Sequence, residues 1–247
     1  MRGDHWLETQ REKDIDELYQ QLRIVEVGVG GRRDMATCSG GQNWPSGGLY
    51  FFFEPGEARK NGEEARVVRV GESSALWNRM MMHRAGNHRS SIFRRHIGAA
   101  LAGKYSYLRT ESWGPGQSAD AEVRSREVKL EQAVSSHIAT MQVLWLAVGG
   151  QAGPLSDRAY LERNIIGLLA GSDSPLDSPS SGWLGRFSPD RRIRESGLWN
   201  LRFLEYSYSR DFLNILKEYV LITTGKLPAP AGSLAPHPTA GATAARR

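Results

Sequence analysis

Four residues of this sequence carry side chains that can activate water, move a proton, bind phosphate and hold a metal ion: Tyr50, Arg79, His83 and Glu162. Arg79 and His83 are four residues apart in a segment with helical periodicity, so we expect both on one face of a helix. Tyr50 stands in an aromatic segment with strong β-strand preference, and Glu162 stands in a separate predicted helix. Hydrolysis of a phosphodiester needs these contributions together.

Each side chain suits one part of that chemistry. Glu162 can hold one hard cation such as Mg²⁺, which keeps most of its waters and accepts phosphate oxygens. Arg79 offers a planar, permanently charged guanidinium that matches a phosphoryl group. A free tyrosine has a pKa of about 10, so Tyr50 can position or deprotonate a water only where positive charge favours its phenolate. His83 can accept a proton from Tyr50 or from water, or it can hold the geometry.

Each of these residues also has an ordinary structural explanation. Tyr50 would be a core aromatic residue, and the arginine and the histidine would lie on a solvated helix face. Glu162 would pair with Arg158 or Arg163 on the surface of its own helix. The order and spacing of the four residues together, rather than any one of them, favour a catalytic site.

A basic segment contains two of these residues. From Ser73 to Thr110 there is no aspartate or glutamate, and the whole chain carries a formal net charge of +5. Such a run can neutralise phosphates and release counterions, which is the sequence-independent part of DNA affinity. The alternative is a solvated basic face. The fixed charges of the segment are Arg79, Arg84, Arg89, Arg94, Arg95, Lys104 and Arg109.

Composition restricts the class of protein. Hydrophobic residues make up 40% and charged residues 24%, as is typical of a folded globular protein. Cys38 is the only cysteine, which excludes an intrachain disulfide and a zinc site built from thiolates. No apolar stretch approaches the roughly 18 residues of a membrane span, and the N-terminal segment is charged throughout. We expect a soluble, cytoplasmic protein without a membrane partner or a small-molecule cofactor.

Hydrophobic periodicity and turn signals predict the secondary structure. We expect strands over residues 48–54 (closed by a Pro-Gly turn), 66–70 and 141–148, and a glycine-rich loop or irregular strand pair over 25–45. We expect helices over residues 8–22, 76–84 (capped by Ser73 or Ser74), 90–103 (with a serine cap and a terminal glycine), 127–140, 158–170 (begun by Ser156 and ended by Gly171) and 209–223. The predicted organisation is an N-terminal helix and lead-in (1–45), a main domain (46–224) and a disordered Pro/Ala-rich tail (225–247).

The arrangement of these motifs resembles the GIY-YIG nuclease family. Gly48-Leu49-Tyr50 corresponds to the first family motif and Arg69-Val70-Gly71 to the second, with Arg79 and His83 at the spacing of the family's first helix. Glu162, in the segment YLERN, corresponds to the metal-binding glutamate, and Asn200, in SGLWN, to a family asparagine. The resemblance covers roughly residues 48–200.

The resemblance implies an α/β (α+β) fold with a small, mainly antiparallel three-stranded sheet, flanked by helices and extended by extra ones. It implies an endonuclease that cleaves DNA with one divalent ion, Mg²⁺, at Glu162. The second motif departs from the family, because Arg69 replaces a tyrosine of the site. The alternatives are therefore a DNA-binding protein of this fold without activity, or a helical interaction protein. The residues expected to bind DNA are Arg69, Arg84, Arg89, Arg94, Arg95 and Asn200.

Overall fold

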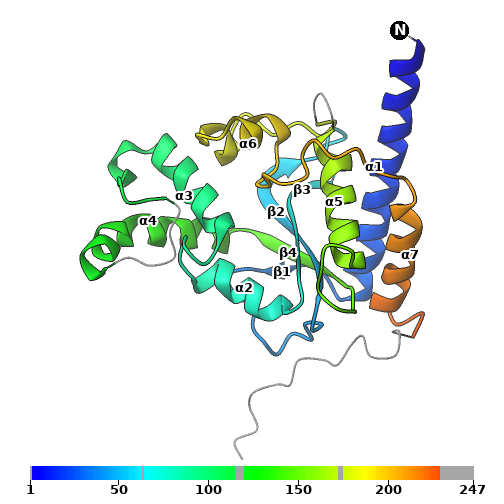
Figure 1. Ribbon diagram of the computed structural model, residues 1–247, viewed down its shortest axis with the longest axis horizontal. Coiled ribbons are helices and arrows are strands. Elements are labelled where there is room, and N and C mark those ends of the chain that lie inside the picture. The colour runs from blue at the N-terminus through cyan, green and yellow to red at the C-terminus, as the bar shows by residue number, and fades with distance from the viewer. Residues whose placement is uncertain (1, 63, 115–119, 172–174, 229–247) are drawn as a thin grey trace, which may run out of the picture.

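The fold is built around a four-stranded antiparallel sheet with the strand order β1-β4-β2-β3 (Figure 1). The computed structural model describes residues 2–62, 64–114, 120–171 and 175–228. The strands are β1 (Arg33–Asp34), β2 (Gly48–Ala58), β3 (Ala65–Ser73) and β4 (Gln142–Ala147). The predicted antiparallel sheet is confirmed, and the two-residue β1 adds a short fourth strand within the segment expected to be a loop or an irregular strand pair.

Helices cover both faces of this sheet (Figure 1). One face packs against α1 (Arg2–Gly28), α5 (Asp157–Ala170) and α7 (Phe212–Thr223). The other face packs against α2 (Leu76–Ala85), α3 (Ile92–Lys104), α4 (Ala121–Ala139) and the short α6 (Arg191–Ser196). Two 3-10 helices, η1 (Ser106–Leu108) and η2 (Leu184–Phe187), lie beside the second layer. Between the second and third predicted strands, α2 carries Arg79 and His83, and α3 and α4 are the extra helices expected there.

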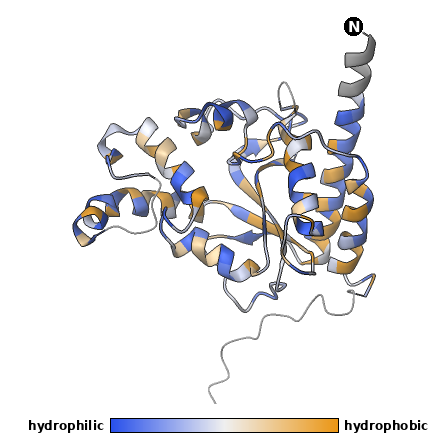
Figure 2. Ribbon diagram, viewed as in Figure 1, coloured by the Kyte–Doolittle hydropathy of each residue, from blue (hydrophilic) through white to orange (hydrophobic). Residues whose placement is uncertain are grey.

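The alternation of side chains along β2 divides the interior into two cores. Leu49, Phe51 and Phe53 point into the core with α1, α5 and α7, whereas Tyr50 and Phe52 point into the core with α2, α3 and α4. All five are buried, and each fully buried side chain of this size stabilises the fold by about 1.5–3 kcal/mol. Figure 2 shows the apolar sides of the helices turned toward the sheet. The strand period therefore decides that Tyr50 faces α2.

Local signals explain where several helices begin and end. The Ser91 side chain accepts a hydrogen bond from the Arg94 N–H and caps α3, and Ser156 caps α5 in the same way through Ala159. Gly171 ends α5 with a positive φ of 68°, as predicted. The predicted serine cap of α2 is wrong. The helix begins after Ala75 without a side-chain cap, and Ser73 accepts a hydrogen bond from the Ala75 N–H instead.

Several predicted boundaries are also wrong. β2 does not end at Pro55-Gly56, because a register shift between Phe53 and Ala58 accommodates these residues within the pairing with β3. β3 continues past Gly71 to Ser73. The first helix reaches Gly28, α4 begins six residues earlier than expected, after an Asp120 cap, and α7 begins at Phe212. These errors all concern ends of elements, where side-chain periodicity carries the least information.

The described part of the chain contains no helix that is both long and apolar enough to cross a membrane. The expectation of a disordered tail falls mainly on residues 229–247, which lie outside the described residues. The division of the chain at residues 45 and 224 stays a prediction.

Candidate functional site

Tyr50 and Gly71 lie opposite each other in the antiparallel pairing of β2 with β3. A Cβ atom added to Gly71 would lie 2.2 Å from both Cζ and Oη of Tyr50, so only glycine leaves room for the phenol ring. The ring is buried and is directed toward α2. The glycine of the second motif therefore sets the position of the tyrosine of the first.

A hydrogen-bond chain leads from this phenol into the helical layer. Nε2 of His83 lies 3.1 Å from Oη of Tyr50, and Nδ1 of His83 lies 2.8 Å from Oγ of Ser91. Burial lowers the pKa of His83 well below its usual value, and the charges of Arg69, Arg79 and Arg94 lower it further. His83 is therefore neutral at physiological pH. A neutral imidazole has one donor and one acceptor nitrogen, so it can take a proton from Tyr50.

Arg79 lies one helical turn before His83 on α2, as the spacing predicted. It is close enough that its charge contributes to the lowered pKa of His83. Its guanidinium is half-buried and has no hydrogen bond or ion pair to any described residue. This cation is therefore available to an anionic ligand.

Arg69 projects from β3 into the same region. Its Nη1 donates to the Trp199 carbonyl at 2.9 Å, and its Cζ lies 4.7 Å from the centroid of the Phe93 ring. Its Nε is buried and has no hydrogen-bond partner among the described residues. The charge of Arg69 lowers the pKa of both His83 and Glu162, so it is a neighbour that these two residues share.

Glu162 on α5 reaches the end of β3. Burial raises the pKa of its carboxyl, and the negative charge of Glu72 raises it further. The charges of Arg69 and Arg202 and the backbone N–H of Glu72 act in the opposite direction. The structural alternative, in which Glu162 pairs on its own helix, is wrong: Arg158 forms its ion pair with Glu72 at 3.3 Å, and Arg163 donates to a backbone carbonyl.

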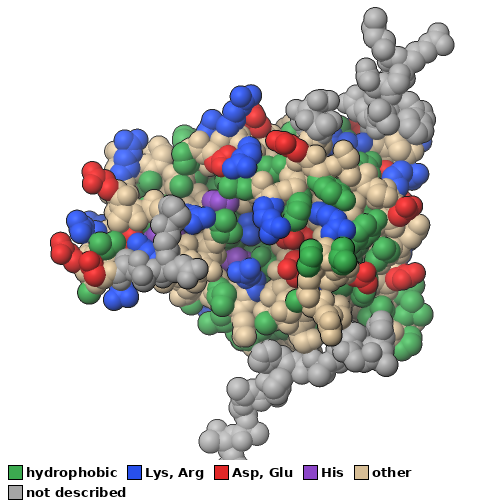
Figure 3. Space-filling view, in the orientation of Figure 1, with side chains coloured by type: hydrophobic (Ala, Val, Ile, Leu, Met, Phe, Trp, Pro, Cys, Tyr) green, Lys and Arg blue, Asp and Glu red, His purple; other side chains and the backbone are tan. Residues whose placement is uncertain are grey.

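Electrostatic interactions link these groups, because the charge of Arg69 lowers the pKa of both His83 and Glu162 and the charge of Arg79 lowers that of His83. Figure 3 shows basic side chains, with histidine and a few acidic side chains among them, in the middle of the face between α3 and α5. The cluster combines a phenol bonded to a neutral imidazole, two guanidinium groups and a carboxylate of raised pKa. Such a set can bind a phosphate, hold a cation and transfer a proton.

The sequence matches the family model described as GIY-YIG domain over residues 9–226. The chain belongs to the GIY-YIG domain family. This confirms the resemblance drawn from the two motifs, and the family is one of nucleases. No curated protein and no solved structure matches the chain. The match extends over α1 and α7, whose apolar side chains share one core with β2 and α5.

Asn200 of this GIY-YIG domain is tied to the edge strand β3. Its side chain accepts from the Val70 N–H at 3.1 Å and donates to the Val70 carbonyl at 2.8 Å. The neighbouring Trp199 N–H donates to the Val68 carbonyl at 2.8 Å. The segment thus covers the free edge of β3 and places the Trp199 carbonyl that holds Arg69. This position suits a supporting role better than the DNA contact expected from the sequence.

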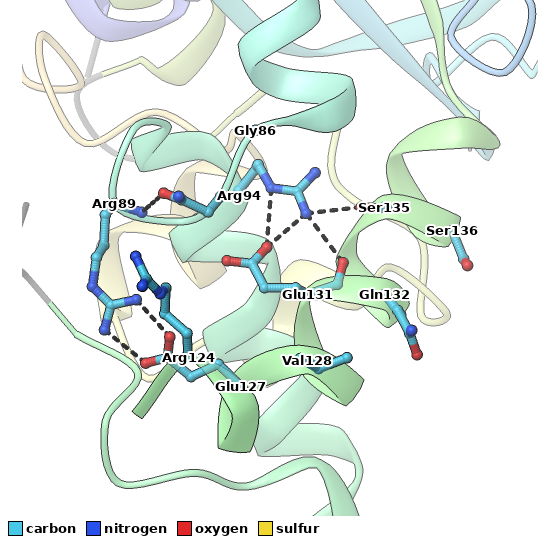
Figure 4. Close-up of a pocket in the computed structure, with 11 residues that line it drawn as sticks. Gly86, Arg89, Arg94, Arg124, Glu127, Val128, Glu131, Gln132, Ser135 and Ser136 are labelled. Atoms are coloured by element: carbon cyan, nitrogen blue, oxygen red, sulfur yellow. Dashed lines mark hydrogen bonds and ion pairs between the residues drawn. The ribbon is translucent and has the colours of Figure 1, made fainter. Parts of the chain in front are cut away.

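Three arginines expected to bind DNA make contacts within the protein. Arg94 is 1% exposed, and its guanidinium donates to Glu131 and to the His83 carbonyl. Arg89 forms a two-fold ion pair with Glu127, and Arg84 donates to two backbone carbonyls. Figure 4 shows both ion pairs in a cavity of about 580 Å³ beside α4. The interpretation of these three residues as a grip on DNA does not fit their positions.

Arg95 differs from these three. It is half-buried on α3, and its side chain has no hydrogen bond or ion pair in the described parts of the chain. Its charge lowers the pKa of the neighbouring His96. Within the basic segment, Arg79 and Arg95 are therefore the candidates whose guanidinium groups remain open to phosphate.

The donor set near Glu162 fits a magnesium-type ion. Among the described residues, no group of three or more His, Cys, Asp or Glu side chains could hold a metal ion. Mg²⁺ needs only one or two carboxylates, because it keeps its waters and takes the remaining oxygens from a phosphate. Glu162 and Glu72 supply two carboxylates that repel each other. A cation bound between them would reduce this repulsion.

Sequence reasoning missed three contributors to this site. The serine cap expected for the 90–103 helix is Ser91, and its side chain also binds the far side of His83. Glu72 directly follows the second motif, and that position was the available signal for it. Trp199 acts through its carbonyl, which the identity of a residue does not reveal.

Proposed function

We propose that this protein is a metal-dependent endonuclease that hydrolyses phosphodiester bonds of DNA. The observation that carries the proposal is the Tyr50–His83 hydrogen bond at 3.1 Å, made beside two guanidinium groups and the Glu162 carboxylate. A buried tyrosine that served only the core would need a hydrogen-bond partner, but it would not need two guanidinium groups and a carboxylate nearby.

In the proposed reaction, Tyr50 orients a water molecule and accepts its proton as the water oxygen forms a bond to phosphorus. His83 is neutral and accepts the phenol proton through Nε2. The phosphorus–oxygen bond to one sugar breaks, and the leaving oxygen takes up a proton from solvent. Ser91 fixes the imidazole from its other side, so that the nitrogen facing Tyr50 stays in place.

The two guanidinium groups would bind the non-bridging phosphate oxygens. Arg79 presents a fork without a partner inside the protein, and Arg69 presents a buried Nε without one. Charge that develops on the phosphoryl oxygens is stabilised most by donors already oriented before the reaction. Arg69 is held in this way by the Trp199 carbonyl and the Phe93 ring.

Glu162, with Glu72 beside it, would hold the divalent ion. Mg²⁺ bound there would polarise the phosphate and stabilise the leaving oxygen. The protein itself supplies the partly buried carboxylate of Glu162 and the nearby positive charges of Arg69 and Arg202, which attract a phosphate backbone.

Plasmid nicking in the presence of Mg²⁺ tests the proposal. Wild type should nick supercoiled DNA, and Glu162→Ala and Arg79→Ala should reduce the rate at least about a hundredfold, as is typical when one group that stabilises a transition state is removed. Arg23→Ala, at an exposed ion pair on α1, is the matched control and should cleave normally.

If wild type cleaves DNA no faster than these two variants, the proposed endonuclease activity is excluded. Binding of DNA without Mg²⁺ then separates the remaining alternatives. A DNA-binding protein without activity shows an affinity that falls linearly with salt on logarithmic axes, whereas a helical interaction protein shows no such affinity.

A further inference from the structure

Three aromatic side chains near the end of α3 are exposed, in contrast to the buried tryptophans of the core. Tyr107 is 76% exposed, Phe187 is 41% exposed and Tyr105 is 37% exposed. We call these three residues, together with Lys104, the aromatic platform. Leaving large rings in water forgoes the stability that burial would give, so such a cluster indicates a surface that binds something.

The rings and the cation of the platform lie close together. The centroids of Tyr105 and Tyr107 are 5.8 Å apart. Nζ of Lys104 lies 5.3 Å from the centroid of Tyr105 and 5.2 Å from that of Phe187, so the ammonium group stands between two rings. Ring faces alternating with positive charge are the pattern by which proteins bind unpaired bases and their phosphates.

The platform is fixed in place rather than carried on a loose loop. A Cβ atom on Gly103 would lie 2.3 Å from the Phe187 carbonyl oxygen, so this glycine allows the end of α3 to touch η2. The Tyr105 N–H donates to the Leu101 carbonyl at 2.8 Å, and Nε of Arg109 donates to the Ala102 carbonyl. These contacts hold the ring-bearing backbone before any ligand arrives.

One helix connects the platform to the candidate active site. α3 begins after Ser91, which binds His83, and ends at Lys104. The thirteen residues of α3, from Ile92 to Lys104, span about 20 Å at about 1.5 Å per residue. That length equals about six stacked nucleotides of one strand at about 3.4 Å each. In Figure 1 the end of α3 lies beside the region of α6, away from the sheet.

The charge of this region suits a nucleic acid strand. Lys104 and Arg109 belong to the segment from Ser73 to Thr110 that has no acidic residue. Bases paired within a duplex have both faces covered by their neighbours, whereas unpaired bases can stack on an exposed ring.

We propose that the aromatic platform binds unpaired bases of the DNA strand that enters the active site, about six nucleotides from the cleaved bond. The inference rests on the proposed nuclease function and adds the class of substrate. The preferred substrate is DNA with a single-stranded segment at that distance, rather than a continuous duplex. No covalent bond of the stacked bases forms or breaks at the platform, which only binds them.

Fluorescence of single-stranded DNA that carries 2-aminopurine tests the proposal, in EDTA so that binding is measured without cleavage. Wild type should quench the fluorescence, and Tyr107→Ala should weaken the affinity for the single strand about tenfold, with a larger loss when Tyr105→Ala is added. Tyr107→Trp should keep the affinity. Tyr206→Ala is the matched control, because Tyr206 is a 38% exposed tyrosine outside the platform.

Equal affinity of wild type and Tyr107→Ala for the single strand overturns the proposal, as does equal affinity of wild type for single strand and blunt duplex. A dimer in sedimentation experiments that dissociates on Tyr107→Ala also overturns it and assigns the platform to a second copy of the chain. Nicking in Mg²⁺ is scored separately. If the protein nicks DNA but its aromatic platform does not bind the single strand, only the platform proposal is overturned. If the platform binds the single strand but the protein does not nick DNA, only the proposed enzyme activity is overturned.

Discussion

The phenol ring of Tyr50 occupies the space that a side chain at Gly71 would need. The two residues are paired across β2 and β3, and a Cβ atom at position 71 would lie 2.2 Å from Oη of Tyr50. Since Oη of Tyr50 is also the atom that approaches Nε2 of His83, a packing relationship between two strands sets the geometry of the proposed proton transfer. The two motifs of the sequence thus meet at one atom.

Gly71→Ala should therefore impair activity as well as stability. The methyl group would push the phenol away from His83 and lower the nicking rate by at least about tenfold, because misplacement of about 1 Å is enough for such losses. Overpacking should cost about 1–3 kcal/mol in the free energy of unfolding, measured with urea. Gly41→Ala is the control, since a Cβ atom there meets nothing within 4 Å. Full activity of Gly71→Ala would show that Tyr50 does not need this position.

The sequence was sufficient where a feature depends on local periodicity. Helical spacing placed Arg79 and His83 on one helix, and strand preference placed Tyr50 in a strand of the sheet. Serine caps predicted the starts of α3 and α5 because their hydrogen bonds close within three residues.

Long-range partners could not be predicted in this way. Arg89 and Arg94 look like free cations within a segment that has no acids, yet α4 supplies Glu127 and Glu131 from about 40 residues further along the chain. From the sequence, Arg69 could point outward from an edge strand. In the structure the Trp199 segment covers that edge and accepts a hydrogen bond from Arg69. Ion pairing and edge coverage depend on tertiary contacts that have no sequence period.

The stability of the protein should fall as the pH falls, in part because of His96. Burial, with the charge of Arg69, lowers the pKa of His96 from 6.5 to about 4, although the Trp199 carbonyl opposes this. Between these two values the unfolded chain binds a proton that the folded chain does not. The stabilising contribution is thus complete above about pH 6.5 and is lost as the pH falls toward about 4, on the order of 3 kcal/mol in total.

Urea unfolding of wild type and His96→Gln at several pH values measures this contribution. The variant should show a shallower loss of stability between about pH 6.5 and about pH 4, because one proton fewer is taken up on unfolding. His83, whose pKa is also lowered, acts in the same direction and keeps some pH dependence in the variant. Parallel curves for the two proteins would show that His96 titrates normally in the folded state.

Glu162→Gln should separate function from stability. The carboxylate is destabilised by burial and by Glu72, so the neutral amide should leave the free energy of unfolding at neutral pH unchanged or raise it, while abolishing Mg²⁺-dependent nicking. Mg²⁺ should raise the melting temperature of wild type but not of Glu162→Gln. Glu218→Gln, at an exposed position of α7, is the control for loss of one negative charge. A variant that loses stability but keeps Mg²⁺-dependent nicking would contradict the assignment of Glu162.

Arg69 should act through its charge, although the family has a tyrosine at this position. Its guanidinium lowers the pKa of Glu162, so Arg69→Met should raise that pKa and shift the acid limb of the nicking rate to higher pH. Arg69→Lys keeps a charge but lacks the fork that reaches the Trp199 carbonyl, and its rate should lie between those of wild type and Arg69→Met.

Arg202→Met is the comparison, because Arg202 also lowers the pKa of Glu162 but is exposed, where water screens its charge. Its shift of the acid limb should therefore be smaller. If Arg69→Tyr cleaves faster than wild type, the arginine replaces the family tyrosine at a cost to catalysis, and its proposed phosphate contact is excluded.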